Sequence, residues 1–116
     1  MSLKRFKTGK RMSQAVARGK AIYLAGQVAD KTTGGSVGEQ TAEILGQIDA
    51  LLAEADSDKT KIMMATIYLA DIATFAEMNA EWDKWVAEGA APARATVEAK
   101  LVAPEYKIEI VIVATT

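Results

Sequence analysis

The hydrophobic residues near the start of the chain favour β structure. Residues 21–25 form a short apolar run, and residues 14–17 form a second run just before it. Gly19 lies between the two runs, where a tight turn accommodates a residue that can adopt positive φ. The pattern therefore predicts a β-hairpin whose second strand ends at Gly26.

Further along, apolar residues recur every three to four positions in two segments, which is the spacing of an amphipathic helix. The first segment begins at Ser36-Val37-Gly38-Glu39 and the second at Thr74-Phe75-Ala76-Glu77, and both sequences match a capping box. Gly89 is placed to end the second helix. The apolar positions are Ile44, Leu45, Ile48, Leu51, Leu52 and Ala55 in the first segment and Phe75, Met78, Trp82, Trp85 and Val86 in the second.

Three later segments have the pattern of strands. Ile62–Leu69 is short, apolar and β-branched towards its end, so it predicts a strand that is largely buried on both faces. Residues 93–99 and 107–114 predict two more strands, with Pro104 between them. The order of strands and helices predicts one α+β domain over residues 1–116, with both helices on one face of a mixed sheet.

The second face of this sheet has no cover within the chain, because two helices of this length can cover only one face. The last strand alternates Ile108, Ile110 and Ile112 with Glu109, Val111 and Val113, so apolar residues point to both faces. A closed homo-oligomer that buries the open face against its copies is the simplest solution. The alternative is a monomer that leaves this face partly exposed.

Composition narrows the chemistry that such a domain can perform. The 116 residues include no histidine and no cysteine, so the commonest general base, transition-metal ligand and thiolate nucleophile are absent together, and no metal site is predicted. The net charge of -1, with basic residues clustered only at the extreme N-terminus, predicts no nucleic-acid partner. No stretch approaches the ~20 apolar residues of a membrane span, so we expect no membrane partner and a cytoplasmic protein.

Arg94 and Glu109 are the charged residues that stand out within the predicted strands. Alternation places Arg94, Thr96 and Glu98 on one face of their strand. In a structural interpretation, which residue types alone favour, Arg94 pairs with Glu98 or Glu109. In a functional interpretation, Arg94 binds the carboxylate of a small acid through two parallel hydrogen bonds, and Glu109 orients or deprotonates a water molecule.

Other candidate residues carry weaker signals. Gly26 could bring backbone N–H groups close to a ligand oxygen, although a glycine at the end of a strand is more often only a turn. Asn79 could bind a ligand or close a local hydrogen-bond network. Trp82 and Trp85 are interpreted as core or interface residues.

Several short motifs occur together along the chain. They are Gly26-Gln27-Val28, Glu39-Gln40-Thr41 with Leu45 and Ile48, Ala65-Thr66-Ile67-Tyr68-Leu69-Ala70-Asp71, Phe75 with Met78-Asn79, Pro92-Ala93-Arg94 and Lys107-Ile108-Glu109-Ile110. In this order and spacing they resemble the Rid (YjgF-type) family, the reactive intermediate deaminases that are also called L-PSP endoribonucleases. The resemblance covers nearly the whole chain from Met12 onward. Two further motifs, Arg11-Met12-Ser13 and Trp82-Asp83-Lys84-Trp85, resemble one branch of this family.

The resemblance implies a chorismate-mutase-like α+β fold that assembles as a trimer, with the three sheets forming a central barrel and a ligand cleft at each subunit interface. It implies that Arg94 binds the carboxylate of a 2-imino acid and that Glu109 positions water for attack on the imine carbon, which yields ammonia and a 2-keto acid. It also implies backbone contacts from Thr96 and a cleft lined in part by Gly26 and Asn79. The family's mechanism needs no metal or organic cofactor.

The chain departs from the deaminating members of the family at three positions. Met12 takes the place of a tyrosine, Thr96 that of a cysteine and Ala25 that of a serine. Because Arg94 and Glu109 remain, the sequence predicts a deaminase that hydrolyses the C=N bond of small 2-imino acids. The alternative is a non-catalytic trimer that binds 2-keto acids, and an endoribonuclease ranks last because the sequence offers no histidine and no basic cleft.

Overall fold

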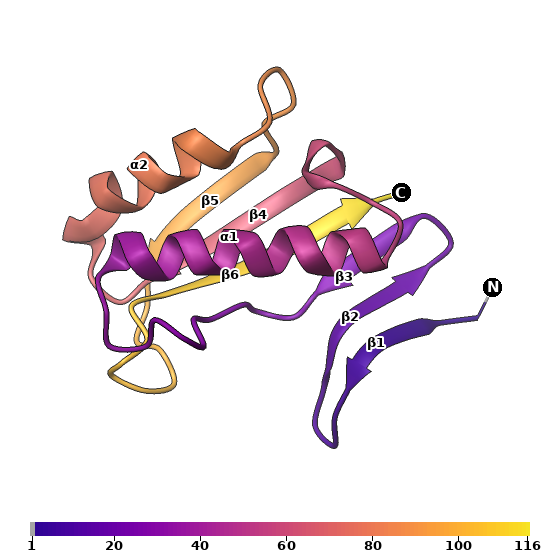
Figure 1. Cartoon of the computed structure of the whole chain (residues 1–116), viewed down its shortest axis with the longest axis horizontal. Coiled ribbons are helices and arrows are strands. Elements are labelled where there is room, and N and C mark those ends of the chain that lie inside the picture. Colours follow the sequence, from indigo (N-terminus) through magenta and orange to yellow (C-terminus); the bar gives the residue numbers. More distant parts are fainter. Residues whose placement is uncertain (1) are drawn as a thin grey trace.

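The computed structural model describes residues 2–116, which form one six-stranded sheet and two α-helices (Figure 1). The strands lie in the order β1-β2-β3-β6-β4-β5, and only the β4–β5 pair is parallel. The bounds are β1 Lys4–Thr8, β2 Ser13–Arg18, β3 Ala21–Leu24, α1 Val37–Glu54, β4 Ile62–Leu69, α2 Phe75–Trp85, β5 Ala93–Glu98 and β6 Ile108–Thr115, with short 3₁₀ turns at Lys59–Lys61 and Ile72–Thr74. The predicted α+β fold with a mixed sheet is confirmed.

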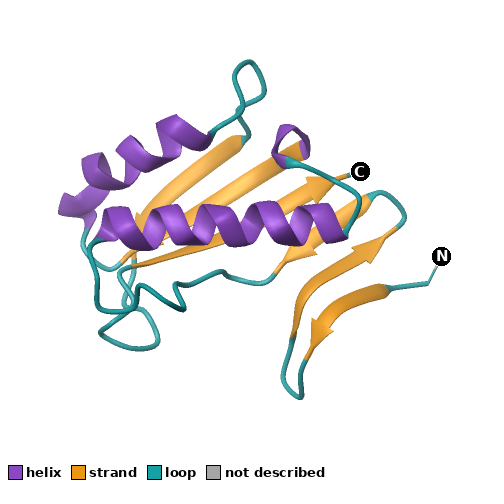
Figure 2. Ribbon diagram, in the orientation of Figure 1, coloured by secondary structure: helices purple, strands orange, loops and turns teal. Residues whose placement is uncertain are grey.

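Both helices pack on the same face of the sheet, as predicted (Figures 1 and 2). The capping box that starts α1 is present, because the Ser36 hydroxyl accepts a hydrogen bond from the Glu39 N–H and the Ser36 N–H donates to the Glu39 carboxylate, both at 3.1 Å. No helix in the described part of the chain is long and apolar enough to cross a membrane. The core lies between the helices and the sheet and is built mainly from Ile22, Ile44, Ile48, Leu52, Ile67, Leu69, Met78, Ile108, Ile110 and Ile112.

Strand β1 was not predicted from the sequence. Its residues are nearly all polar and exposed, and only Phe6 packs against the core, so no hydrophobic alternation marks it. The strand exists because it pairs antiparallel with β2, in a register that places Phe6 opposite Ala15. Backbone pairing with a neighbour therefore forms this strand.

The second helix starts where it was predicted, at Phe75 after Thr74, but the predicted capping box is not formed and the predicted end at Gly89 is wrong. The Thr74 side chain makes no cap bond, and Glu77 instead accepts a hydrogen bond of 2.8 Å from the N–H of Gly38. Glu77 thus satisfies an N–H group in the first turn of α1, which has no partner inside its own helix. The helix ends at Trp85, because Val86 has an extended ψ of 136°, and the ammonium of Lys59 binds the Trp85 carbonyl at 2.5 Å.

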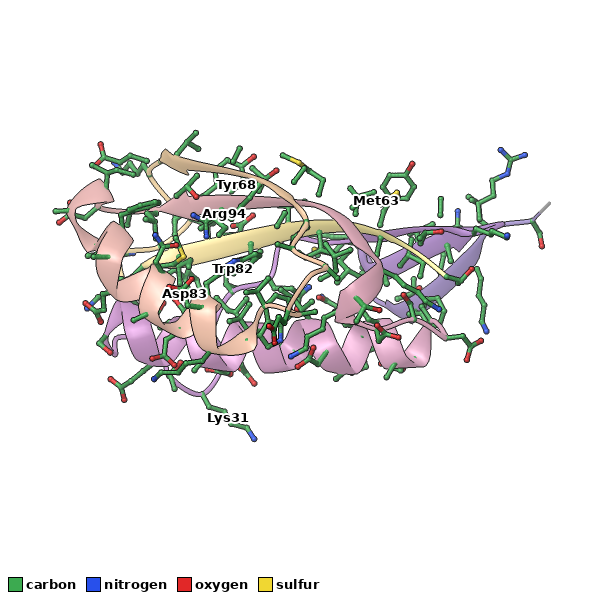
Figure 3. The ribbon with its side chains drawn as sticks, turned by 90° about the horizontal axis from the view of Figure 1, so that it is seen from above. Lys31, Met63, Tyr68, Trp82, Asp83 and Arg94 are labelled. Atoms are coloured by element: carbon green, nitrogen blue, oxygen red, sulfur yellow. The ribbon has the colours of Figure 1, made fainter. Side chains whose placement is uncertain are left out.

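The register of the sheet decides to which face each charged residue of the strands points. Arg94 of β5 lies opposite Ala65 of β4, and Glu109 of β6 lies opposite Tyr68. Ala65 is buried beneath the helices, whereas Tyr68 points to the other side of the sheet (Figure 3). Because paired residues share a face and neighbours along a strand alternate, Arg94 lies on the helix face and Glu109 on the open face.

The open face carries exposed apolar side chains. Tyr23, Met63 and Val97 are 55%, 49% and 44% exposed, which makes them among the most exposed large hydrophobic residues of the described chain. Figure 3 shows Met63 and Tyr68 on the side of the sheet away from the helices. The apolar, uncovered second face predicted from the pattern is therefore present.

Candidate functional site

Arg94 lies between the edge strand β5 and α2. Its Nη1 donates a hydrogen bond of 2.8 Å to Oδ1 of Asn79. The guanidinium carbon lies 5.2 Å from the ring centroid of Trp82 and 5.7 Å from that of Phe75, which is the geometry of cation–π contacts. An amide and two aromatic rings therefore orient the guanidinium, and most of its five N–H groups remain available.

The structural ion pairs considered from the sequence are not formed. Among residues 2–116, Arg94 makes no ion pair with any carboxylate, and Glu98 instead accepts a hydrogen bond of 3.0 Å from the N–H of Ile72. Trp82, interpreted from the sequence as a core residue, is indeed buried, but it also supports the guanidinium. The guanidinium of this half-buried arginine therefore keeps N–H groups with which a carboxylate could form two parallel hydrogen bonds.

Thr96 follows Arg94 on the same face of β5. Its hydroxyl oxygen is buried and has no hydrogen-bond partner, the one side-chain polar atom of this kind among the described residues. Buried polar atoms normally have a hydrogen-bond partner. The Thr96 hydroxyl, two residues from Arg94 on the same strand, is an exception to this rule.

Glu109 lies on the open face beside Gly26. A methyl group at Gly26 would come within 2.1 Å of Oε2 of Glu109, so only glycine leaves room for the carboxylate in this position. The Glu109 carboxylate makes no hydrogen bond or ion pair with any residue from 2 to 116. It is therefore free to bind a water molecule or a ligand.

Glu109 and Gly26 line a cavity of about 800 Å³. Its remaining walls come from β1, the start of β2, the loop after β3 and α1, and the lining residues include Lys7, Met12, Gln14, Gln27, Val28 and Asp30. The Gln27 side chain is fixed in the wall, because its Nε2 donates to Oε1 of Gln14 and to the carbonyl of Ala25, both at 3.0 Å. The cavity is therefore lined by the acidic residues Glu109 and Asp30, the basic residue Lys7 and the two hydrogen-bonded amides of Gln14 and Gln27.

The loop that forms one wall of this cavity is held by Glu43 of α1. The Glu43 carboxylate accepts hydrogen bonds from the N–H groups of Asp30, Lys31 and Thr32 and from the Thr32 hydroxyl, at 2.6 to 3.0 Å. Desolvation raises the pKa of Glu43, but these hydrogen bonds outweigh it and lower the pKa to about 2. Glu43 therefore stays ionised and keeps the loop after β3 in place at neutral pH.

The candidate residues from the sequence fall into two groups. Arg94, Asn79 and Thr96 lie together at the edge strand and α2, whereas Glu109 and Gly26 lie together at the cavity. Sequence reasoning did not identify Gln14, Lys7 or Glu43, whose roles depend on contacts between distant segments. Gln27 had a usable signal, since it directly follows Gly26 in a motif of the resemblance.

The sequence and the fold of this chain are both similar to those of known proteins. The family model described as endoribonuclease L-PSP matches residues 2–116. A RutC family protein from Haemophilus influenzae is 45% identical over 115 residues, which covers 99% of both chains, and the RutC family protein YoaB from Escherichia coli is 44% identical over 114 residues, which covers 98% of both chains. The crystal structure of NMB1025, a YjgF family member from Neisseria meningitidis, superposes with a TM-score of 0.96 at 46% identity and covers all of this chain and 96% of its own. The chain therefore belongs to the YjgF/RutC family of endoribonuclease L-PSP domains, as its motifs indicated.

Proposed function

We propose that this protein hydrolyses small reactive 2-imino acids to 2-keto acids and ammonia, at a cleft formed between subunits. The observation that carries the proposal is the guanidinium of Arg94, which Asn79 and two aromatic rings hold in place without a carboxylate partner among residues 2–116. A planar fork of this kind binds the carboxylate of a small acid with two parallel hydrogen bonds. The chain also belongs to the family whose resemblance implied this activity.

Arg94 and Glu109 of the same chain cannot both contact one small molecule. The two residues lie on strands separated by β4 and are offset by three residues along it. Strand spacings of about 4.8 Å and rises of about 3.3 Å per residue place their Cα atoms about 14 Å apart, with side chains on opposite faces. We therefore assign Arg94 and Asn79 from one subunit and Glu109 and Gly26 from a neighbour to the same cleft.

The proposed assembly is a homotrimer of this single domain. The apolar open face of each sheet would be buried against its neighbours, and closed symmetry would repeat the same contact three times. In that arrangement the β5 edge of each subunit lies against the cavity of the next. Thr96 would add contacts to the substrate carboxylate from the β5 backbone.

The chemistry uses only groups of the chain and water. Arg94 holds the carboxylate of the 2-imino acid, and Glu109 accepts a proton from a water molecule as its oxygen bonds to the imine carbon. The protonated Glu109 then gives this proton to the amino nitrogen of the tetrahedral intermediate. When the reactant is the protonated imine, this transfer makes the nitrogen an ammonium group. The C–N bond then breaks and releases ammonia, while the deprotonated Glu109 takes up the hydroxyl proton and passes it to solvent, which leaves the 2-keto acid. None of these steps requires a metal or an organic cofactor.

A turnover assay tests the proposal. A threonine dehydratase generates 2-iminobutyrate in place, and the release of 2-ketobutyrate is followed with and without the protein. We expect the protein to accelerate release above the spontaneous rate. If the protein binds 2-ketobutyrate but leaves the rate unchanged, it is the non-catalytic keto-acid-binding trimer, and the deaminase proposal fails.

The assembly is tested by light scattering at micromolar concentration. We expect the mass of three chains, because the exposed Tyr23, Met63 and Val97 are buried only when copies associate. A single-chain mass across the working concentration range would exclude any cleft that uses residues of two subunits.

A further inference from the structure

The charges of this protein are strongly segregated along the chain. Seven of the fourteen lysines and arginines precede Ala21, and all fifteen carboxylates follow Ala29. The seven basic residues lie on β1, β2 and the turns beside them, a unit that we call the basic hairpin (residues 2–20). They are Lys4, Arg5, Lys7, Lys10, Arg11, Arg18 and Lys20, and all are exposed. The near-neutral total charge therefore conceals a strongly cationic end of the sheet.

Some charges of the basic hairpin have partners in the described chain, and others have none. Lys7 forms an ion pair of 3.5 Å with Glu54, and the ammonium of Lys4 lies 5.2 Å from the ring centroid of Phe6. The side chains of Arg5 and Lys10 make no ion pair or hydrogen bond with residues 2–116. Exposed charges with no partner project a field into the solvent around them.

The basic hairpin also borders the cavity that holds Glu109. Lys7 contributes directly to the cavity lining, as do Met12 and Gln14 from the turn and the start of β2. Lys10 belongs to the turn between β1 and β2, which is closed by a hydrogen bond of 2.8 Å from the Gly9 N–H to the Met12 carbonyl. The basic hairpin therefore reaches the lining of the cavity through Lys7, and Lys10 lies in the turn that also carries Met12 of the lining.

We propose that the basic hairpin is an electrostatic collector, which draws small organic anions to the Glu109 cavity and so raises the rate at which they are captured. This inference rests on the proposed function of that cavity as a carboxylate-substrate site. A cationic surface beside a cleft raises the local concentration of an anionic ligand and its association rate. Reactive 2-imino acids hydrolyse spontaneously in water. An enzyme therefore increases the overall rate of hydrolysis only if it binds them faster than they react with water.

The experiment compares two double variants over a range of ionic strength. Arg5→Gln/Lys10→Gln removes two charges of the basic hairpin that do not line the cavity. Lys61→Gln/Lys84→Gln is the control, because it also lowers the net charge by two at exposed positions outside the hairpin, although Lys84 is paired with Glu81 at 3.1 Å. For each protein, kcat/KM and kcat for 2-iminobutyrate and the Kd for 2-ketobutyrate are measured at 10 and 500 mM salt. The Debye length is about 30 Å at the lower concentration and only a few ångströms at the higher.

At 10 mM salt we expect Arg5→Gln/Lys10→Gln to lower kcat/KM and raise Kd by roughly threefold or more, with kcat unchanged. At 500 mM salt this variant and the parent protein should converge, because the hairpin charges are then screened. The control should behave as the parent at both concentrations.

Equal kcat/KM and Kd for the hairpin variant and the parent at 10 mM salt would overturn the inference. A charge effect on the binding of an RNA oligonucleotide, without one on 2-ketobutyrate, would also overturn it. Absence of turnover by the parent protein would refute the deaminase proposal alone, because the Kd measurements would still test the collector.

Discussion

Replacement of Arg94 by lysine should abolish deamination while the assembly and most of the stability are kept. Lysine retains a positive charge on β5, but it cannot form two parallel hydrogen bonds with a carboxylate. The lysine ammonium is also not planar, so it cannot stack on the rings of Trp82 and Phe75 as the guanidinium does. The loss of one charge-assisted hydrogen bond, about 1.5–3 kcal/mol, corresponds to a decrease in 2-ketobutyrate affinity of roughly 10- to 100-fold. Calorimetric titration with 2-ketobutyrate and the turnover assay measure these effects.

Arg5→Lys is a matched control for this substitution, because it makes the same chemical change at an exposed position outside the cavity. It should leave turnover, affinity and melting temperature unchanged. Arg94→Ala should lose activity as well. If Arg94→Lys instead unfolds while the residual folded protein binds 2-ketobutyrate normally, Arg94 belongs to the scaffold and the anchor assignment is wrong.

Replacement of Glu109 by glutamine should retain keto-acid binding and lose turnover. The amide has nearly the same shape as the carboxylate, but it cannot accept a proton from the attacking water. Removal of a general base typically lowers the rate by about 10²- to 10⁴-fold, which should appear in kcat and not in the Kd for 2-ketobutyrate. A glutamine variant with normal kcat would exclude Glu109 as the base.

Gly26→Ala provides an independent comparison, because it leaves Glu109 in the sequence but removes the space that its carboxylate occupies. An alanine Cβ would lie 2.1 Å from Oε2, so the side chain of Glu109 must move. We expect turnover to fall as it does in Glu109→Gln, with light scattering confirming the same assembly. Normal turnover would show that the position of the carboxylate beside Gly26 is not the active one.

The sequence alone determined most of the fold. A short apolar, β-branched run located β4, alternation located β5 and β6, and helical periodicity with the Ser36 capping box located α1. Local pattern missed β1, and for α2 it predicted a capping box that is not formed and an end that lies too late. The first is formed by pairing with β2, and Glu77, the residue expected to cap the second, binds Gly38 of the other helix. Such contacts join segments far apart in sequence and leave no periodic trace.

For the candidate site, the sequence determined the residue types and the tertiary structure decided their arrangement. An arginine in a small, apolar strand and a glutamate in an apolar one were visible as charges that need partners. One strand and a change of face separate them, because β4 lies between β5 and β6 in the sheet, and strand order is not encoded in local pattern. Only the folded chain shows that Arg94 is held by Asn79 on α2 and that Glu109 fits because Gly26 lacks a side chain. Long-range packing, which brings residues of different elements within a few ångströms, is therefore the reason that the candidate residues fall into two groups.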